Sequence, residues 1–127
     1  MRAPFACALC LLSLLTAAAA DLPAARTVIV VATEYQFRPN LLTFKVGVPY
    51  RLRVENHGAE LHEFTAGAFF KAVEVRNPEG LDVDGTELVV HPGESKELRF
   101  TARKPARYPV ICADHDWIGM TAEIVVE

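Results

Sequence analysis

The chain has 127 residues, of which 51% are hydrophobic and 23% charged, with 13 Lys and Arg against 16 Asp and Glu and a formal net charge of −3. This size and composition predict one globular domain and argue against a wholly disordered chain, because half of the residues can contribute to a core. The slightly acidic balance, without a block of basic residues, also argues against a nucleic-acid surface, which needs clustered cations.

The N-terminal segment has the pattern of a secretory signal peptide. Arg2 precedes a mainly apolar run that ends at Leu15, and a tract of small residues follows, ending at Ala20. This order favours export with cleavage after Ala20 over a transmembrane anchor, which needs about 18 apolar residues. We therefore expect a signal peptide at 1–20 and one domain at 21–127, exported most simply to a bacterial periplasm.

The rest of the chain has the pattern of short β-strands separated by turns, with no helix. Segments such as Tyr50–Glu55 alternate apolar and polar residues, which is typical of strands with one exposed face. The expected strands are Thr27–Ala32, Leu41–Val46, Tyr50–Glu55, Leu61–Thr65, Phe69–Val75, Thr86–Val90, Glu97–Thr101, Tyr108–Cys112 and Met120–Val126. The longest expected loop is Asn77–Gly85. Roughly eight short strands predict an all-β fold, an antiparallel sandwich or barrel.

Cleavage of the signal peptide would leave Cys112 as the single cysteine, because Cys7 and Cys10 lie within 1–20. No intramolecular disulfide could then form. A free thiol in an oxidising compartment is a liability unless it is buried or bonded to something, and a metal ion is the obvious candidate.

Residues 112–120 gather soft and borderline metal ligands in one loop near the C-terminus. Cys112 shares a strand face with apolar residues, and so does Met120 on the next strand. Both faces must point into the core, so the two sulfur atoms point inward at the two ends of one hairpin loop, with His115 between them. Taken singly, Cys112 and Met120 would be ordinary core residues. Together with His115 they predict a metal site.

A fourth ligand has to come from elsewhere in the chain, and His62 is the most economical choice. His62 shares a strand face with Phe64, a residue that belongs in a core, whereas His57 and His91 lie in turns where exposure is expected. One Cys, two His and a weak Met suit copper cycling between Cu(I) and Cu(II). Zinc also accepts Cys and His ligands, but it gains little from a thioether.

Two segments of the chain resemble the cupredoxin family of plastocyanin-like and pseudoazurin-like blue copper proteins. They are Asn56–Phe64 and the pattern Tyr108-Pro109-Val110-Ile111-Cys112-x-x-His115-x-x-x-Gly119-Met120. Further similarities in Tyr35-x-Phe37-x-Pro39, Val46-Gly47 and Pro92-Gly93-Glu94-Ser95 extend the resemblance over most of the domain. The resemblance implies a cupredoxin-like Greek-key β-sandwich. It also implies one copper ion per chain, bound by His62, Cys112, His115 and, axially, Met120.

The function implied by the resemblance is one-electron transfer between redox partner proteins by a type 1 (blue) copper site. His62 would anchor the metal within the sandwich, and the more exposed His115 would conduct the electron. We expect a monomer that turns over no substrate and is therefore not an enzyme. A cysteine hydrolase using Cys112 is a third class of function, disfavoured because catalytic thiolates are exposed and this Cys faces a core.

The sequence departs from the family pattern at two places near the expected ligands. Glu63 stands where plastocyanin-like members typically have an Asn that helps to tie the two ligand loops, so we expect a different brace.

Asp114 and Asp116 flank His115, where the family usually has an apolar docking patch. Carboxylates there would favour a basic partner or a role in capturing copper. The alternative function is therefore copper sequestration or delivery with the same ligands. Trp117 is expected to be a lid over the ligand loop.

Overall fold

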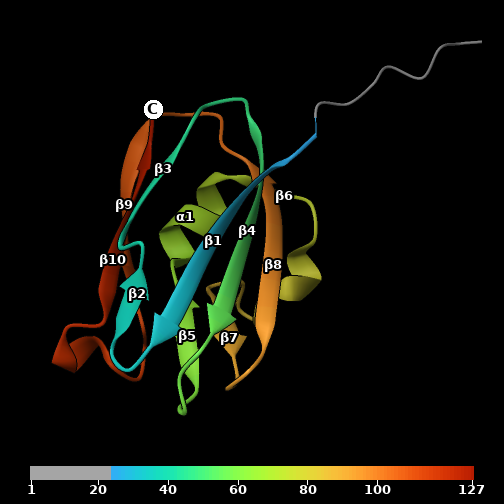
Figure 1. Cartoon of the computed structure of the whole chain (residues 1–127). Helices are drawn as coiled ribbons and strands as arrows, with labels where there is room; N and C mark the ends of the chain where they lie inside the picture. Colours follow the sequence, from blue (N-terminus) through green and yellow to red (C-terminus); the bar gives the residue numbers. More distant parts are fainter. Residues whose placement is uncertain (1–23) are drawn as a thin grey trace, which may run out of the picture.

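The computed structural model describes residues 24–127, so the predicted signal peptide at 1–20 lies outside the described residues. Strands β1 to β10 form two five-stranded sheets, one ordered β2-β1-β4-β8-β6 and the other β3-β10-β9-β5-β7. The strands are β1 (Arg26–Thr33), β2 (Gln36–Arg38), β3 (Leu41–Phe44), β4 (Pro49–Asn56), β5 (His62–Thr65), β6 (Glu74–Val75), β7 (Glu87–Val90), β8 (Ser95–Thr101), β9 (Ala106–Ile111) and β10 (Thr121–Val126). Figure 1 shows the two sheets packed face to face. The predicted all-β sandwich is confirmed.

Alternating side chains of both sheets form the core, as the period of two predicts. In β4 every second residue is buried, from Tyr50 to Asn56, while the residues between them are partly exposed. The opposite sheet contributes Phe44, Phe64 and Ile124, all fully buried. The apolar surface removed from water between the sheets is the main stabilising contribution to such a fold.

The expectation of a purely antiparallel sandwich is wrong at two places. Strand β1 pairs with β4 in parallel, and β3 pairs with β10 in parallel. A period-two pattern reports which face of a strand is buried, but it carries no information on the direction of the neighbouring strand. The short strand β2 was also not expected, because the turn residues that begin at Arg38 obscure its three residues.

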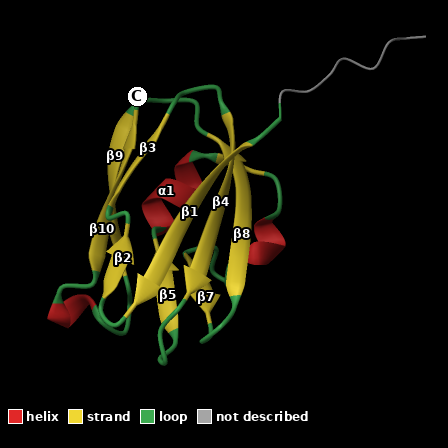
Figure 2. Ribbon diagram, viewed as in Figure 1, coloured by secondary structure: helices red, strands yellow, loops and turns green. Residues whose placement is uncertain are grey.

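The predicted strand Phe69–Val75 is wrong over most of its length, because helix α1 occupies Gly67–Ala72 and only Glu74–Val75 is a strand. Figure 2 shows this helix and two shorter 3-10 turns, at Pro78–Gly80 and Asp116–Ile118. Phe69 and its neighbour Phe70 are both buried. Consecutive residues of a strand point to opposite faces, whereas in a helix two adjacent rings can both reach one core.

Helix α1 belongs to the core because it contacts both sheets. The ring centroid of Phe69 lies 5.9 Å from that of Phe44, 5.1 Å from that of Phe100 and 5.5 Å from that of Tyr108. Such packing stabilises a helix of six residues, which is too short to persist by propensity alone. Within residues 24–127 no helix is long and apolar enough to span a membrane.

The end of the sandwich opposite the C-terminus carries the loops that matter for the predicted site (Figure 1). Strands β9 and β10 form an antiparallel hairpin in which Thr121 pairs with Ile111, so Cys112 and Met120 close its loop. Strand β5 joins the same sheet through the pair Thr65 and Ile111. The start of β5 and the hairpin loop therefore meet at one end of the molecule.

Replacing Phe69 by Ala should lower the free energy of unfolding by about 3–5 kcal/mol, because it removes a fully buried ring and leaves a cavity. Urea denaturation of the variant and of the parent protein measures the difference. Val83, which is 100% exposed, provides the control, and Val83→Ala should change stability by no more than about 0.5 kcal/mol. A loss of less than about 1 kcal/mol for Phe69→Ala, close to what a surface substitution causes, would contradict the core position of α1.

Candidate metal centre

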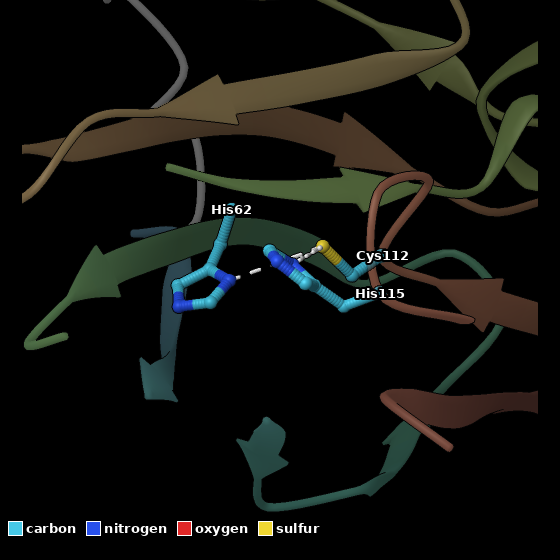
Figure 3. Close-up of side chains that lie close together, drawn as sticks. All are labelled: His62, Cys112 and His115. Atoms are coloured by element: carbon cyan, nitrogen blue, oxygen red, sulfur yellow. Dashed lines mark hydrogen bonds between the residues drawn. The ribbon is translucent and has the colours of Figure 1, made fainter. Parts of the chain in front are cut away.

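Three of the four predicted ligands lie together at this end of the sandwich. One ligand atom each from His62, Cys112 and His115 lies within 4.8 Å of the others. The Cys112 Sγ atom is 3.9 Å from Nδ1 of His62 and 3.4 Å from Nδ1 of His115. Figure 3 shows the two imidazoles converging on the sulfur from separate segments of the chain. The arrangement can hold a single metal ion.

The local structure explains why these side chains point inward. His62 is the first residue of β5 and shares its buried face with Phe64. Cys112 directly follows β9 and is fully buried, while His115 lies on the loop, with 12% of its side chain exposed. His62 is the deeper imidazole at 1% exposed. This difference is the one that the sequence predicts between the two histidines.

Met120 is fully buried at the base of the same loop. Its carbonyl oxygen accepts a hydrogen bond from the Cys112 amide at 3.0 Å, and its own amide donates to the carbonyl of His115 at 3.2 Å. Gly119 precedes it with φ of +89°, a left-handed conformation that favours glycine and lets the chain turn back into β10. The backbone of Met120 is therefore bonded to both other residues of the loop that carry potential ligand atoms.

Each histidine presents one ring nitrogen to the sulfur and the other to a carboxylate. His62 Nε2 lies 3.2 Å from Glu34 Oε1, and His115 Nε2 lies 2.8 Å from Glu60 Oε2. A carboxylate only accepts hydrogen bonds, so it favours the tautomer with the proton on Nε2 and leaves the Nδ1 lone pair facing the sulfur. Carboxylates that hold a histidine in this way are common around metal sites.

Glu63 ties β5 to the ligand loop, which is the different brace expected at this position. Its backbone amide donates a 3.4 Å hydrogen bond to Cys112 Sγ. Its buried carboxylate lies 3.0 Å from the same sulfur and accepts a 3.4 Å hydrogen bond from the Asp114 amide. The backbone and the side chain of this one residue thus fix both the sulfur and the loop.

The turn between β1 and β2 adds two residues to the site that sequence reasoning missed in this role, Glu34 and Tyr35. The Tyr35 hydroxyl donates to Glu60 Oε1 at 2.9 Å, and its ring centroid lies 4.8 Å from that of His115. Glu60, also missed, lies two residues before His62. No local pattern identifies these contacts, because they join residues at least 25 positions apart in the sequence. The one signal in the sequence is that Tyr35 and Glu60 both lie in segments that resemble the family.

Two other expectations concern residues around the site. His57 and His91 are both exposed and lie outside the cluster of potential ligands, as expected. The predicted lid role of Trp117 is wrong, because this residue is 78% exposed and therefore covers little. Its Nε1 donates instead to the carbonyl of Asp114, which stabilises the 3-10 turn of the loop.

Burial raises the pKa of the Cys112 thiol to about 11, and hydrogen bonds from backbone amides only partly oppose this effect. At neutral pH the metal-free protein therefore holds a protonated thiol, which must lose its proton when a metal binds. Catalytic cysteines need the opposite shift, toward thiolate at neutral pH. The raised pKa thus argues against a cysteine hydrolase.

The comparisons with known proteins agree with the fold. Residues 5–126 match the family described as "Cupredoxin-like domain". The chain belongs to this family of cupredoxin-like domains. In the comparison with curated proteins, none matched.

Three solved structures illustrate the similarity of fold. Auracyanin A, titled a "blue" copper protein from Chloroflexus aurantiacus, is 19% identical with a TM-score of 0.60, over 82% of this chain and 100% of its own. A reduced auracyanin from Roseiflexus castenholzii is 18% identical with a TM-score of 0.60, over 82% of this chain and 98% of its own. A copper nitrite reductase from Nitrosomonas europaea is 15% identical with a TM-score of 0.60, over 84% of this chain but 50% of its own. At these identities the similarity establishes the fold.

The metal-free protein should lose stability as the pH rises above about 9, because the Cys112 pKa is about 11 in the folded state against 9.0 as its ordinary value. Between these two values the unfolded chain binds fewer protons than the folded one, so rising pH favours unfolding. The loss should approach about 2 kcal/mol at pH 11. Urea denaturation at a series of pH values from about 8 to about 11, a range that includes both pKa values, measures it. The Cys112→Ala variant should lack this loss of stability. If the free energy of unfolding of the two proteins falls equally with pH, the prediction is contradicted.

Proposed function

We propose that His62, Cys112, His115 and Met120 bind one copper ion in a mononuclear type 1 site, and that the protein transfers single electrons between partner proteins. The observation that carries the proposal is the convergence of two imidazole Nδ1 atoms on a buried cysteine sulfur. The blue copper protein among the structures of similar fold supports the same ion.

The donor set fits copper better than zinc. A thiolate with two imidazoles and a weak thioether is typical of copper sites in electron-transfer proteins. Met120 is the residue that discriminates, because zinc has little use for a thioether and no redox chemistry. Bound copper would supply a one-electron couple between Cu(I) and Cu(II), and the chain would supply the fixed ligand positions.

The chain's own residues support electron transfer by holding the ligands rigidly. His62 and Cys112 are buried, and each has a hydrogen-bond partner that is not itself a ligand: Glu34 for His62 and the Glu63 amide for Cys112. Ligands fixed in advance move little when an electron arrives, which keeps the reorganisation small. The 12% exposed His115 side chain would be the route to a partner.

A partner would dock around His115, where the exposed loop combines apolar and acidic side chains. Trp117 and Ile118 are 78% and 46% exposed, and Asp114 and Asp116 beside them are exposed too. This combination would suit a redox partner with a basic surface, because complementary charge steers association. We propose that the protein acts in this way as a monomer, without turning over a substrate.

The cellular setting belongs to the same proposal. Residues 1–20 would be a cleaved signal peptide and residues 21–127 the copper-binding domain, acting in the periplasm. The alternative function, sequestration or delivery of copper, would use the same ligands. The exposed carboxylates beside His115 favour it, since they would attract cations to the entrance of the site.

Two measurements on the copper-loaded protein separate the carrier from the copper-handling protein. We expect a reversible one-electron potential, and copper loss to an excess of chelator that is much slower than reduction by a small-molecule reductant. The physical reason is that both buried ligands also form hydrogen bonds to residues that are not ligands, His62 with Glu34 and Cys112 with the Glu63 amide. Rapid copper exchange without an accessible Cu(II) state would contradict the carrier and favour the alternative.

The ligand assignment is tested by a matched pair of substitutions. Cys112→Ser should abolish the intense visible absorption that follows addition of Cu(II), because that band arises from the thiolate. Met120→Leu should keep the colour and shift the reduction potential, since a weak axial ligand tunes the potential without forming the strong bond. An unaltered band in Cys112→Ser would refute the assignment. Circular dichroism of both variants controls for folding.

A further inference from the structure

Three glutamates from different segments each contact one of the potential ligands. Glu34, in the turn after β1, lies 3.2 Å from His62 Nε2, and Glu60, just before β5, lies 2.8 Å from His115 Nε2. Glu63, within β5, lies 3.0 Å from the Cys112 sulfur. Every potential ligand in the cluster of Figure 3 therefore has a carboxylate against it.

The carboxylates are held in place by further hydrogen bonds. Glu34 Oε1 accepts bonds from the amides of Ala59 at 2.7 Å and Glu60 at 3.0 Å. The chain at Gly58 lies so close that an added Cβ atom would come within 2.1 Å of the same oxygen, so a larger residue there would displace the Glu34 carboxylate. Amide donors of this kind favour the charged form of a carboxylate. The turn thus favours a charged carboxylate at this position.

These three glutamates differ from the other paired carboxylates of the molecule. Glu74 pairs with Arg103, Glu123 with Arg107, and Glu97 with arginines of β4. Within residues 24–127, neither lysine nor arginine forms an ion pair with Glu34, Glu60 or Glu63. A cation bound among the ligands that they contact would neutralise their negative charge.

We propose that Glu34, Glu60 and Glu63 are positioning residues that bias the bound ion toward its divalent state. This inference rests on the copper site proposed above. Negative charge near an ion stabilises Cu(II) more than Cu(I), because the Coulomb energy scales with the charge of the ion. The carboxylates therefore lower the reduction potential below that of the same site with neutral side chains.

The size of the effect should follow the burial of each carboxylate, because water screens an exposed charge. Glu63 is 6% exposed, and the side chains of Glu34 and Glu60 are 30% and 48% exposed. The order of influence is therefore Glu63, then Glu34, then Glu60.

Substitution by glutamine separates charge from geometry. The amide oxygen of Glu34→Gln can still accept the hydrogen bonds from 59 and 60, and that of Glu63→Gln can accept the bond from Asp114. These two variants thus lose a charge and keep the hydrogen bonds that they accept from the backbone. Glu74→Gln removes a charge from the paired carboxylate on β6, far from the ligand loop, and serves as the control.

The experiment measures Cu(II) and Cu(I) affinities separately with competing chelators at pH 7, together with the reduction potential and the visible spectrum. We expect Glu63→Gln to lower the ratio of Cu(II) to Cu(I) affinity by about tenfold, equal to a rise in potential of about 59 mV for one electron. Glu34→Gln and Glu60→Gln should give progressively smaller changes, and Glu74→Gln none. The visible band should keep its position.

The outcomes for this inference and for the proposed function are distinct. Wild-type protein without a blue Cu(II) spectrum overturns the proposed type 1 site. A blue wild-type protein whose three variants keep the same affinity ratio overturns the inference alone, and so does a ratio that rises. A band that shifts in the variants without a change in ratio assigns the glutamates a purely geometric role and also overturns it.

Discussion

The structure of the site depends on one buried sulfur atom. Cys112 Sγ is fully enclosed where the start of β5 meets the β9–β10 hairpin, and the Glu63 amide and two imidazoles approach it from different directions. A thiol in such surroundings resists ionisation, so its anionic form requires a cation close by. The surrounding glutamates strengthen that requirement, because each adds a carboxylate within 3.2 Å of a ligand atom or ligand ring. The cluster is thus electrostatically complementary to a cation at its centre.

Much of this arrangement could be predicted because it is encoded locally. Parity along β9 and β10 places Cys112 and Met120 inside, and the short hairpin loop keeps His115 near both. His62 is recognisable since it alternates with a core phenylalanine, Phe64. The same reasoning gave most strands and the two-layer architecture, because alternation directly records which face of a strand is buried.

The features that could not be predicted depend on contacts through space. Phe69 and Phe70 resemble part of a strand in the sequence. The segment is helical instead, and in this conformation both rings are buried in the same core. Strand direction in the β1–β4 and β3–β10 pairs depends on how the chain crosses between sheets. Glu34 and Glu60 lie in turns where acidic residues are ordinary, and their role becomes visible only when the β1–β2 turn lies against the imidazoles.

That turn also bears on the choice between an electron carrier and a protein that delivers copper. Its consecutive residues Glu34 and Tyr35 reach both histidines, one directly and the other through ring packing and Glu60. Moving His115 aside to release an ion would break the contact with Glu60 and separate the ring from Tyr35. Release of the metal would therefore break the contacts of His115 with Glu60 and Tyr35. Electron transfer through the ring would leave these contacts intact. A site braced in this way favours a function in which the ion stays bound and only its charge changes.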